Sequence, residues 1–300
     1  MRIGLLGSGG MGRQHMAAAA GLPDVEMVTR NTPPFDTLDP ADREGLLNAM
    51  LADASIDAID ICLPTPTHVQ TACAALAAGK HVLCEKPMAL SADDCERILN
   101  AQRASGRTLM VAQVLRFFPA YRQLAQFVRG GRLGRARSAV FTRESGVPNW
   151  APWMADTNQS GGAILDLLVH DFDQAIELFG YPATIQASRI ESANTVRAHL
   201  QCGEVEVRVE GGWFVDGRPF SMGFEVEFGR GRLVYRHNTL VLDAPGLPME
   251  SVQLADVDPY REQLRYFTQC CMQNIFPAEC PPTASVAAVE LALTVRDRVA

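Results

Sequence analysis

The stretch that decides the fold is residues 2–12, which read Arg-Ile-Gly-Leu-Leu-Gly-Ser-Gly-Gly-Met-Gly. The run Arg2–Leu6 predicts a buried strand, and Met11–Ala20 predicts the helix that follows it. Glycines separate the two elements in the spacing Gly-x-Gly-x-x-Gly, which permits a tight turn, a close approach to a pyrophosphate, and close packing of helix on strand. The pattern predicts a dinucleotide-binding loop, with contacts from Gly7, Ser8, Gly9, Gly10, Met11 and Gly12.

The second predicted strand, Val25–Thr29, bears on the choice of cofactor. An acidic residue that binds the ribose is expected near its end, about twenty residues after the glycines. The chain has Thr29-Arg30-Asn31 instead. A cation beside hydrogen-bonding side chains suits a 2′-phosphate better than a 2′-hydroxyl, so we expect Thr29 and Arg30 to bind the cofactor, with a preference for NADP. The alternative that Arg30 is simply solvated stays open.

The segment Thr32–Ala41 is unusual for a nucleotide-binding half. It contains the consecutive Pro33-Pro34, and a helix is predicted directly after it, over Asp42–Leu51. A parallel crossover needs at least about ten to twelve residues including its helix, and proline disfavours a helix at the residue before it. We therefore predict no crossover helix within this segment, so the parallel sheet is truncated after its second strand.

The pattern then becomes regular. Strands are predicted over Asp57–Leu63, His81–Glu85 and Thr108–Gln113, and helices over Thr67–Ala78 and Ser91–Ser105. Alternating strands and helices with short connections predict a parallel sheet with right-handed crossovers. The first part of the chain is thus predicted to be an α/β Rossmann-type dinucleotide-binding domain, residues 1–115.

Two turns of this domain are predicted to face the ligand, because ligands bind outside the carboxyl ends of the strands in an open parallel sheet. Lys86 follows the strand His81–Glu85 directly, and Pro87 keeps it out of helical geometry. The alternative is an ordinary surface lysine in a loop. The predicted cofactor contacts of the two turns are Leu63, Pro64, Thr65, His68, Glu85 and Lys86.

The second domain is predicted to span residues 116–300. A helix near Ala120–Arg129 and a strand, Ala136–Arg143, precede a loop over Glu144–Ser160. Later segments alternate apolar and polar residues, which predicts an α+β domain with an open, mainly antiparallel sheet. We expect the last helices, Pro259–Gln273 and Thr283–Val299, to pack back on the first domain. The strands are predicted over Thr184–Arg189, Val196–Cys202, Glu204–Phe214, Phe220–Phe228 and Arg232–Tyr235.

Residues 161–172 read as one helix that carries Asp166 and His170 on the same face, four residues apart. A carboxylate near an imidazole can orient the ring and raise its basicity, as a general base needs. The alternative is a helix-surface ion pair. Because apolar residues surround the pair, we expect the helix to be mostly buried, and buried polar groups need a partner or a purpose.

Composition excludes several classes of function. The net charge of −7 and the lack of a Lys/Arg cluster argue against nucleic acid as a partner. The sequence contains no apolar run of eighteen residues, so we predict no membrane-spanning helix. The N-terminus does not resemble a secretory signal. The eight cysteines include no Cys-x-x-Cys pair, and His81 with Cys84 lacks a second ligand pair. We expect a cytoplasmic protein with reduced thiols and no metal site.

Taken together, the motifs resemble those of the glucose–fructose oxidoreductase/inositol dehydrogenase (Gfo/Idh/MocA) family over nearly the whole chain. The resemblance rests on the glycine motif, on Thr65–His68, on Ala78–Pro87, and on Gly161-Gly162 through Asp166 and His170-Asp171. The chain departs from the family pattern in the shortened region after Asn31 and in the missing ribose acid.

The resemblance implies an NAD(P)-dependent oxidoreductase that acts on a sugar, sugar-derivative or cyclitol hydroxyl. His170 would take the hydroxyl proton as hydride leaves for the nicotinamide, Asp166 would hold the ring or a neighbouring hydroxyl, and Lys86 would stabilise the developing alkoxide. It also implies a homodimer or homotetramer built through the exposed face of the sheet. The predicted substrate contacts are Lys86, Arg116, Asn149, Trp153, Asp166 and His170.

A second class of function stays open. Some proteins of this fold bind a dinucleotide as sensors or regulatory proteins without turnover, and their expected mark is loss of the Lys/Asp/His set. Because this chain retains Lys86, Asp166 and His170, the enzyme is the favoured interpretation.

Overall fold

The computed structural model describes residues 1–29, 39–149, 151–246 and 248–299. The chain divides into two compact units, one formed by residues 1–117 with 257–286 and the other by residues 118–256 with 287–300. The first division falls two residues after the expected boundary at residue 115. Residues 257–286, which include a helix that was expected to pack back on the first domain, group with the first unit. The two units are described in turn.

The first unit is built on a five-stranded parallel sheet with the order β2-β1-β3-β4-β5. The strands β3, β4 and β5 are buried along their whole length, as expected for strands covered on both faces. The predicted parallel Rossmann-type sheet is therefore confirmed. Its strands are β1 Arg2–Leu6, β2 Glu26–Val28, β3 Ala58–Ile61, β4 His81–Cys84 and β5 Leu109–Val111.

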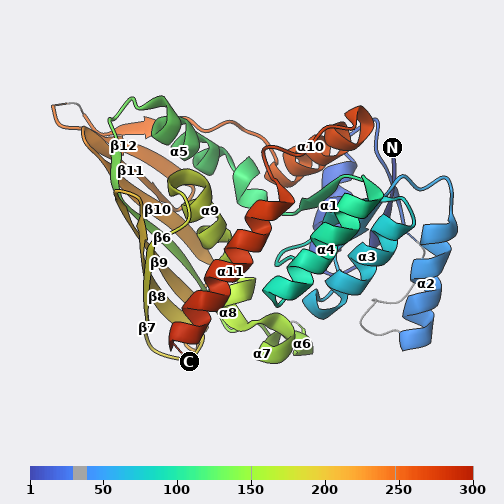
Figure 1. Ribbon diagram of the computed structural model, residues 1–300. Coiled ribbons are helices and arrows are strands. Elements are labelled where there is room, and N and C mark those ends of the chain that lie inside the picture. Colours follow the sequence, from blue (N-terminus) through green and yellow to red (C-terminus); the bar gives the residue numbers. More distant parts are fainter. Residues whose placement is uncertain (30–38, 150, 247, 300) are drawn as a thin grey trace. The chain divides into compact units, whose positions relative to one another are not determined.

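Helices pack on this sheet, and α3 and α4 lie side by side in Figure 1. α4 begins where Ser91 Oγ accepts a hydrogen bond from the amide of Asp94, and it ends at Gly106 in the left-handed conformation. Helix α10, the second to last of the chain, packs against α1 and the 3₁₀ helix η3 and adds Leu264 and Phe267 to the core. The helices are α1 Gly10–Ala19, α2 Pro40–Ala52, η2 Thr65–Thr67, α3 His68–Ala77, α4 Ala92–Ser105, η3 Val114–Phe117 and α10 Pro259–Gln273.

The connection after β2 is described only in part. Residues 30–38 lie outside the described residues, so the predictions for Arg30 and for most of Thr32–Ala41 cannot be compared with the structure. α2 begins two residues before its predicted start, and Asp39 caps it by accepting a hydrogen bond from the amide of Asp42. In the described part of the chain β2 is the edge strand beside β1. The truncation of the sheet stays a prediction.

The second unit is built on an eight-stranded sheet with the order β13-β12-β11-β10-β6-β9-β8-β7. The β6–β9 pair is parallel and the other neighbours are antiparallel, which confirms the predicted mainly antiparallel sheet. Strands β12 and β13 were not predicted. The strands are β6 Ala136–Gly146, β7 Thr184–Arg189, β8 Thr195–Cys202, β9 Val205–Phe214, β10 Ser221–Phe228, β11 Gly231–Arg236, β12 Thr239–Asp243 and β13 Glu250–Val252.

The two faces of this sheet differ in character. Helix α9 packs across β6, β8 and β9 on the apolar face (Figure 1). The other face carries partly exposed ion pairs between neighbouring strands, such as Arg197–Glu210 at 2.7 Å and Arg232–Asp243 at 2.9 Å. The helices of this unit are α5 Pro119–Gly130, α6 Pro152–Ala155, α7 Thr157–Ser160, α8 Gly162–Asp166, α9 Val169–Phe179 and most of α11, Pro282–Val299.

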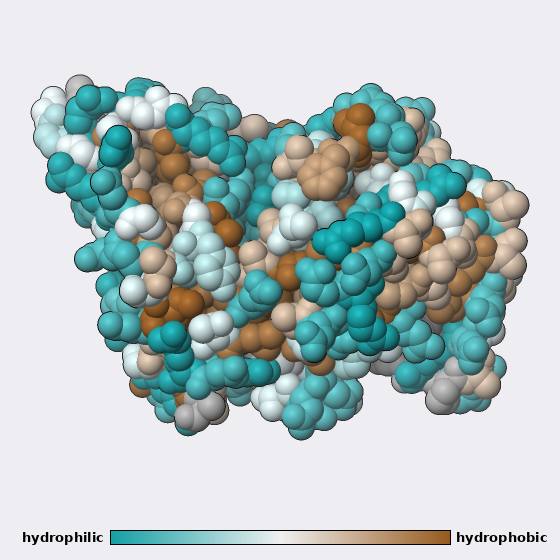
Figure 2. All heavy atoms as spheres, viewed as in Figure 1, coloured by the Kyte–Doolittle hydropathy of each residue, from teal (hydrophilic) through white to brown (hydrophobic). Residues whose placement is uncertain are grey.

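The face shown in Figure 2 carries both hydrophilic and apolar residues. Hydrophilic side chains cover most of the face shown in Figure 2, with apolar residues in smaller groups between them. None of the described helices combines the length and the apolar composition that crossing a lipid bilayer requires.

Candidate functional site

In the glycine loop between β1 and α1, two glycines lie too close to neighbouring backbone atoms to carry a side chain. Gly7 has φ +104°, and a Cβ there would lie 2.2 Å from the carbonyl oxygen of Cys62, while a Cβ at Gly12 would lie 1.9 Å from the carbonyl oxygen of Gly7. At Gly9 and Gly10, by contrast, a Cβ would meet no described atom within 4 Å. The loop is therefore packed on its inner side and open on its outer side.

The outer side of the loop suits an anion. The N-terminus of α1 lies at Gly9, and no side chain of the described residues caps it. Its first amide groups therefore keep their donors available, and the helix dipole favours negative charge there. The open space at Gly9 and Gly10 is where a pyrophosphate would approach the backbone. The residues present fit the predicted dinucleotide.

The turns after β3 and β4 are joined by His68. This side chain is fully buried, with Nδ1 2.9 Å from the carbonyl oxygen of Pro87 and Nε2 2.9 Å from that of Leu63. Burial lowers the pKa of His68 although the two carbonyl groups partly offset it. The ring thus fixes the spacing of the two turns that carry Thr65 and Lys86.

Lys86 lies at the end of β4, as predicted. It is partly exposed, the Lys86–Pro87 peptide is cis, and the amide of Lys86 donates a 3.1 Å hydrogen bond to Glu85 Oε2. The chain contains 27 cationic residues, of which only Lys80 and Lys86 are lysines. Lys80 has a structural task, because its Nζ donates to the carbonyl oxygens of Asp53 and Ile56, both at 2.8 Å.

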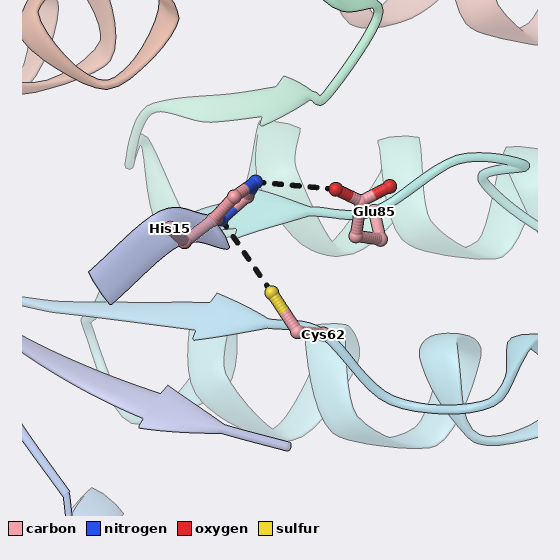
Figure 3. A group of neighbouring side chains, drawn as sticks. All are labelled: His15, Cys62 and Glu85. Atoms are coloured by element: carbon pink, nitrogen blue, oxygen red, sulfur yellow. Dashed lines mark hydrogen bonds and ion pairs between the residues drawn. The ribbon is translucent and has the colours of Figure 1, made fainter. Parts of the chain in front are cut away.

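A buried histidine lies behind these turns and was missed by the sequence analysis (Figure 3). His15 is 2% exposed, with Nδ1 2.8 Å from Asp60 Oδ2 and Nε2 3.2 Å from Glu85 Oε1. The sulfur of Cys62 lies 3.5 Å from the same Nδ1. One signal was present, since Asp60 interrupts the apolar strand β3 and a buried carboxylate needs a partner.

The charges of this group follow from its contacts. Burial alone would lower the pKa of His15, but the charges and hydrogen bonds of Asp60 and Cys62 together more than offset it, so the pKa is raised well above its usual value. Burial would raise the pKa of Glu85, but the hydrogen bond and charge of His15 lower it. Burial, followed by the charge of Asp60, raises the pKa of the Cys62 thiol. The contacts with the two carboxylates therefore favour the imidazolium form of His15.

The same group has the composition of a metal site. Potential ligand atoms of His15, Cys62 and Glu85 lie within 4.8 Å of one another. A metal would have to displace the protons of both the imidazolium and the thiol. The raised pKa values of His15 and of the Cys62 thiol work against metal binding at this place.

In the second unit, the predicted single helix over residues 161–172 is wrong. Helix α8 ends at Asp166 and α9 begins at Val169, because the amides of Leu167 and Leu168 both donate to the carbonyl of Ala163 and break the regular register. Asp166 and His170 are partly exposed residues on either side of this turn, not one turn apart on a continuous helix. The expected burial of the surrounding apolar residues is confirmed for Leu165, Leu168 and Val169, whereas Leu167 is partly exposed.

A buried ion pair lies next to His170 and was also missed. Arg143 on β6 and Asp171 on α9 are 3% and 0% exposed, and the guanidinium contacts both carboxylate oxygens, at 2.7 and 3.2 Å. Burial raises the pKa of Asp171, with Arg143 acting against it. The pair fastens the first turn of α9, and with it the backbone of His170, to the centre of the sheet.

The other predicted site residues are placed as follows. Arg116 lies in η3 and donates to the carbonyl of Glu279 at 3.1 Å. Asn149 is exposed, Trp153 is partly buried on α6 beside a small apolar cluster, and Thr29 is exposed after β2. Lys86 and Arg116 belong to the first unit, and Asn149, Trp153, Asp166 and His170 belong to the second. Their convergence on one cleft stays a prediction.

Comparison with known proteins agrees with both units. Residues 1–113 match the family described as "Oxidoreductase family, NAD-binding Rossmann fold", and residues 121–233 match the GFO/IDH/MocA C-terminal domain. The chain belongs to the Gfo/Idh/MocA oxidoreductase family. The resemblance inferred from the motifs is confirmed, and the family is one of NAD-binding oxidoreductases.

Individual proteins of known name share a modest fraction of this sequence. The chain is 32% identical over 199 residues to inositol 2-dehydrogenase of Rhizobium meliloti, which covers 63% of this chain and 58% of the relative. It thus spans little more than half the length of that relative. UDP-N-acetylglucosamine 3-dehydrogenase of Acidithiobacillus ferrooxidans superposes with a TM-score of 0.80 at 22% identity, covering 100% and 97% of the two chains. Biliverdin reductase of Synechocystis, solved with biliverdin and NADP⁺, gives 0.79 at 20% identity, covering 99% and 98%.

The two kinds of glycine in the loop should respond differently to alanine. Gly12→Ala should lower the free energy of unfolding by about 1–3 kcal/mol or more, because the new Cβ meets backbone. Gly9→Ala should leave stability nearly unchanged and weaken NAD(P)H binding, because its Cβ would enter the open space where the pyrophosphate is predicted to bind. Urea unfolding and fluorescence titration measure the two effects. Equal stability losses in both variants would contradict this assignment.

The Arg143–Asp171 pair should be costly to break. Arg143→Met should lower the free energy of unfolding by about 3–5 kcal/mol, because it leaves a buried carboxylate unpaired. Adding Asp171→Leu should recover much of the loss. Arg197→Met, at a partly exposed pair, is the matched control and should cost within about 1 kcal/mol. A double variant as unstable as Arg143→Met alone would argue against a desolvated pair.

The charge of His15 makes stability depend on pH. Because its pKa is raised in the folded state, its stabilisation is fully present below about pH 6.5 and is lost as pH rises through the folded pKa. The difference in free energy of unfolding between wild type and His15→Gln should therefore shrink at alkaline pH. Urea unfolding at a series of pH values measures it, and a constant difference would show that His15 is neutral in the fold.

Proposed function

We propose that the protein is an NAD(P)-dependent oxidoreductase that transfers hydride between nicotinamide and a hydroxyl or ketone of a sugar, sugar derivative or cyclitol. The observation that carries the proposal is Lys86. It is one of two lysines in a chain that otherwise uses arginine, and Lys80 is accounted for by two backbone carbonyls. An ammonium is a compact point charge, which a planar guanidinium does not replace.

The proposed chemistry assigns one role to each residue. The dinucleotide supplies the two-electron acceptor for the hydride when it is bound. His170 accepts the proton of the substrate hydroxyl, so that the carbon–oxygen bond becomes a carbonyl as hydride leaves the carbon. Lys86 stabilises the alkoxide charge that develops on the same oxygen. Asp166 orients the imidazole or a neighbouring hydroxyl, and the reverse sequence reduces a ketone.

The substrate class rests on the catalytic set and on named relatives. Inositol 2-dehydrogenase and UDP-N-acetylglucosamine 3-dehydrogenase are named for oxidation of ring hydroxyls, whereas biliverdin reductase has the same fold and a different substrate. The fold therefore leaves the substrate open, and the residues that contact it set specificity. We assign substrate contacts to Lys86, Arg116, Asn149, Trp153, Asp166 and His170.

Exchange of Lys86 for arginine tests the enzyme proposal. Lys86→Arg keeps the positive charge but should lower kcat about 10²-fold or more, because the bulkier guanidinium cannot place its charge at the alkoxide. Dinucleotide affinity should change much less. The control is the opposite exchange, Arg97→Lys, at an exposed pair on α4. Steady-state kinetics on a panel of polyols and sugars give the result, and full activity of Lys86→Arg would contradict the assignment.

The cofactor preference is proposed to be NADP. The support is the exposed Thr29 directly after β2, with Arg30 next in the chain and no acid at this position. Arg30→Ala should weaken NADPH binding by about 1–3 kcal/mol, the scale of a charged hydrogen bond, and leave NADH binding nearly unchanged. Fluorescence titration with both dinucleotides measures this. An equal loss for both would place Arg30 away from the 2′-phosphate.

The assembly and location expected from the sequence stay predictions. The partly exposed, ion-paired face of the second sheet is where a homodimer or homotetramer would form, and light scattering at micromolar concentration tests it. A cytoplasmic location is likewise a proposal. A non-catalytic dinucleotide sensor is the weaker alternative, because the chain retains Lys86, Asp166 and His170.

A further inference from the structure

A continuous series of contacts runs from the buried sheet to the backbone of Lys86. Asp60 Oδ2 contacts His15 Nδ1 at 2.8 Å, His15 Nε2 contacts Glu85 Oε1 at 3.2 Å, and Glu85 Oε2 accepts from the amide of Lys86 at 3.1 Å. The first three side chains are 0%, 2% and 6% exposed. They come from β3, from α1 and from the residue after β4, as Figure 3 shows for His15 and Glu85.

His15 is the member on which this series depends. Two carboxylates buried around one ring would repel each other and would pay a large desolvation cost without a cation between them. If the imidazolium were removed, one carboxylate would have to take up a proton or move towards water. Glu85 is the one placed to move, because it follows the end of β4 while Asp60 lies inside β3. The hydrogen bond to the Lys86 amide would then be lost.

We propose that His15 is a positioning residue for Lys86. The inference rests on the proposed function, in which Lys86 is catalytic. His15 cannot touch a substrate from its buried place, so it acts through Glu85. It also stands one turn after Gly12 on α1, so one side chain links the helix whose N-terminus forms the anion site to the turn that carries the lysine. The dinucleotide and the ammonium are thereby kept in a fixed spatial relation.

His81 supplies a matched control for a purely structural role. It is also buried, at 8% exposure, and it lies at the opposite end of β4 from Glu85. Its Nδ1 accepts a 3.0 Å hydrogen bond from the amide of Thr108, which joins it to β5. Loss of the His81 side chain should lower the stability of the fold without changing the position of Lys86.

The experiment compares His15→Gln, Glu85→Gln, their double variant and His81→Gln. His15→Gln should lower kcat by about tenfold or more with a change below about threefold in dinucleotide Kd. The double variant should be no worse than the poorer single variant, because both act on one contact. His81→Gln should lower Tm and leave kcat unchanged. Additive effects of His15→Gln and Glu85→Gln, or equal kcat losses in His15→Gln and His81→Gln, would overturn the proposal.

A second readout needs no turnover. Reductive methylation of the two lysine amines, followed by peptide mass spectrometry, compares Lys86 with the buried Lys80. Saturating NAD⁺ or NADP⁺ should protect Lys86 in the wild type, and in His15→Gln and Glu85→Gln the labelling of Lys86 should rise about threefold while Lys80 is unchanged. Should His15→Gln fail to fold, Glu85→Gln reports on the same contact.

The two readouts separate the two proposals. Protection of Lys86 in a wild-type protein that oxidises no polyol or sugar would defeat the proposed function and leave the positioning role intact. Identical labelling of Lys86 in the wild type and in the folded variants would defeat the positioning role whatever the activity.

Discussion

The close approach of α1 to the end of β3 is the constraint on which the first unit depends. Gly7 and Gly12 leave no room for a side chain, because the backbone at Cys62 and the loop itself occupy the space where a Cβ would stand. This approach sets where α1 begins, and therefore where its amide groups meet an anion. It also brings His15, one turn further along α1, between the two carboxylates. One steric requirement thus arranges both the candidate binding loop and the buried charges behind it.

In both units a buried ionisable pair lies beside a side chain that is proposed to be catalytic. In the first unit the ring of His15 lies between Asp60 and Glu85, and in the second a guanidinium holds Asp171 with two hydrogen bonds. Such groups contribute little net stability compared with apolar packing, but removing one partner is costly. Each group stands one residue away from a proposed catalytic side chain. The free energy lost when one partner is removed is consistent with a role in positioning the neighbouring side chain. Apolar contacts are less directional and would position it less specifically.

The basic residues also carry information that neither motif nor fold provides. All but two of the 27 basic residues of the chain are arginines. Ammonium and guanidinium groups are not interchangeable, so the two lysines are informative. Lys80 shows one reason, since a single ammonium serves two backbone carbonyls in a confined space. Lys86 is partly exposed at a strand end, where confinement is weaker and chemistry is the better explanation.

The sequence by itself determined the parallel sheet, the glycine loop, the strand-end Lys86 and the antiparallel character of the second sheet. These features are local, because they follow from spacing and periodicity within a few residues. Tertiary structure decided the rest. The pairing of His15 with Asp60 and of Arg143 with Asp171 joins residues 45 and 28 positions apart, and the break between Asp166 and His170 arises where two amides share one carbonyl. Periodicity cannot report such partners, because long-range pairing depends on how the elements pack and on which buried charges must be compensated.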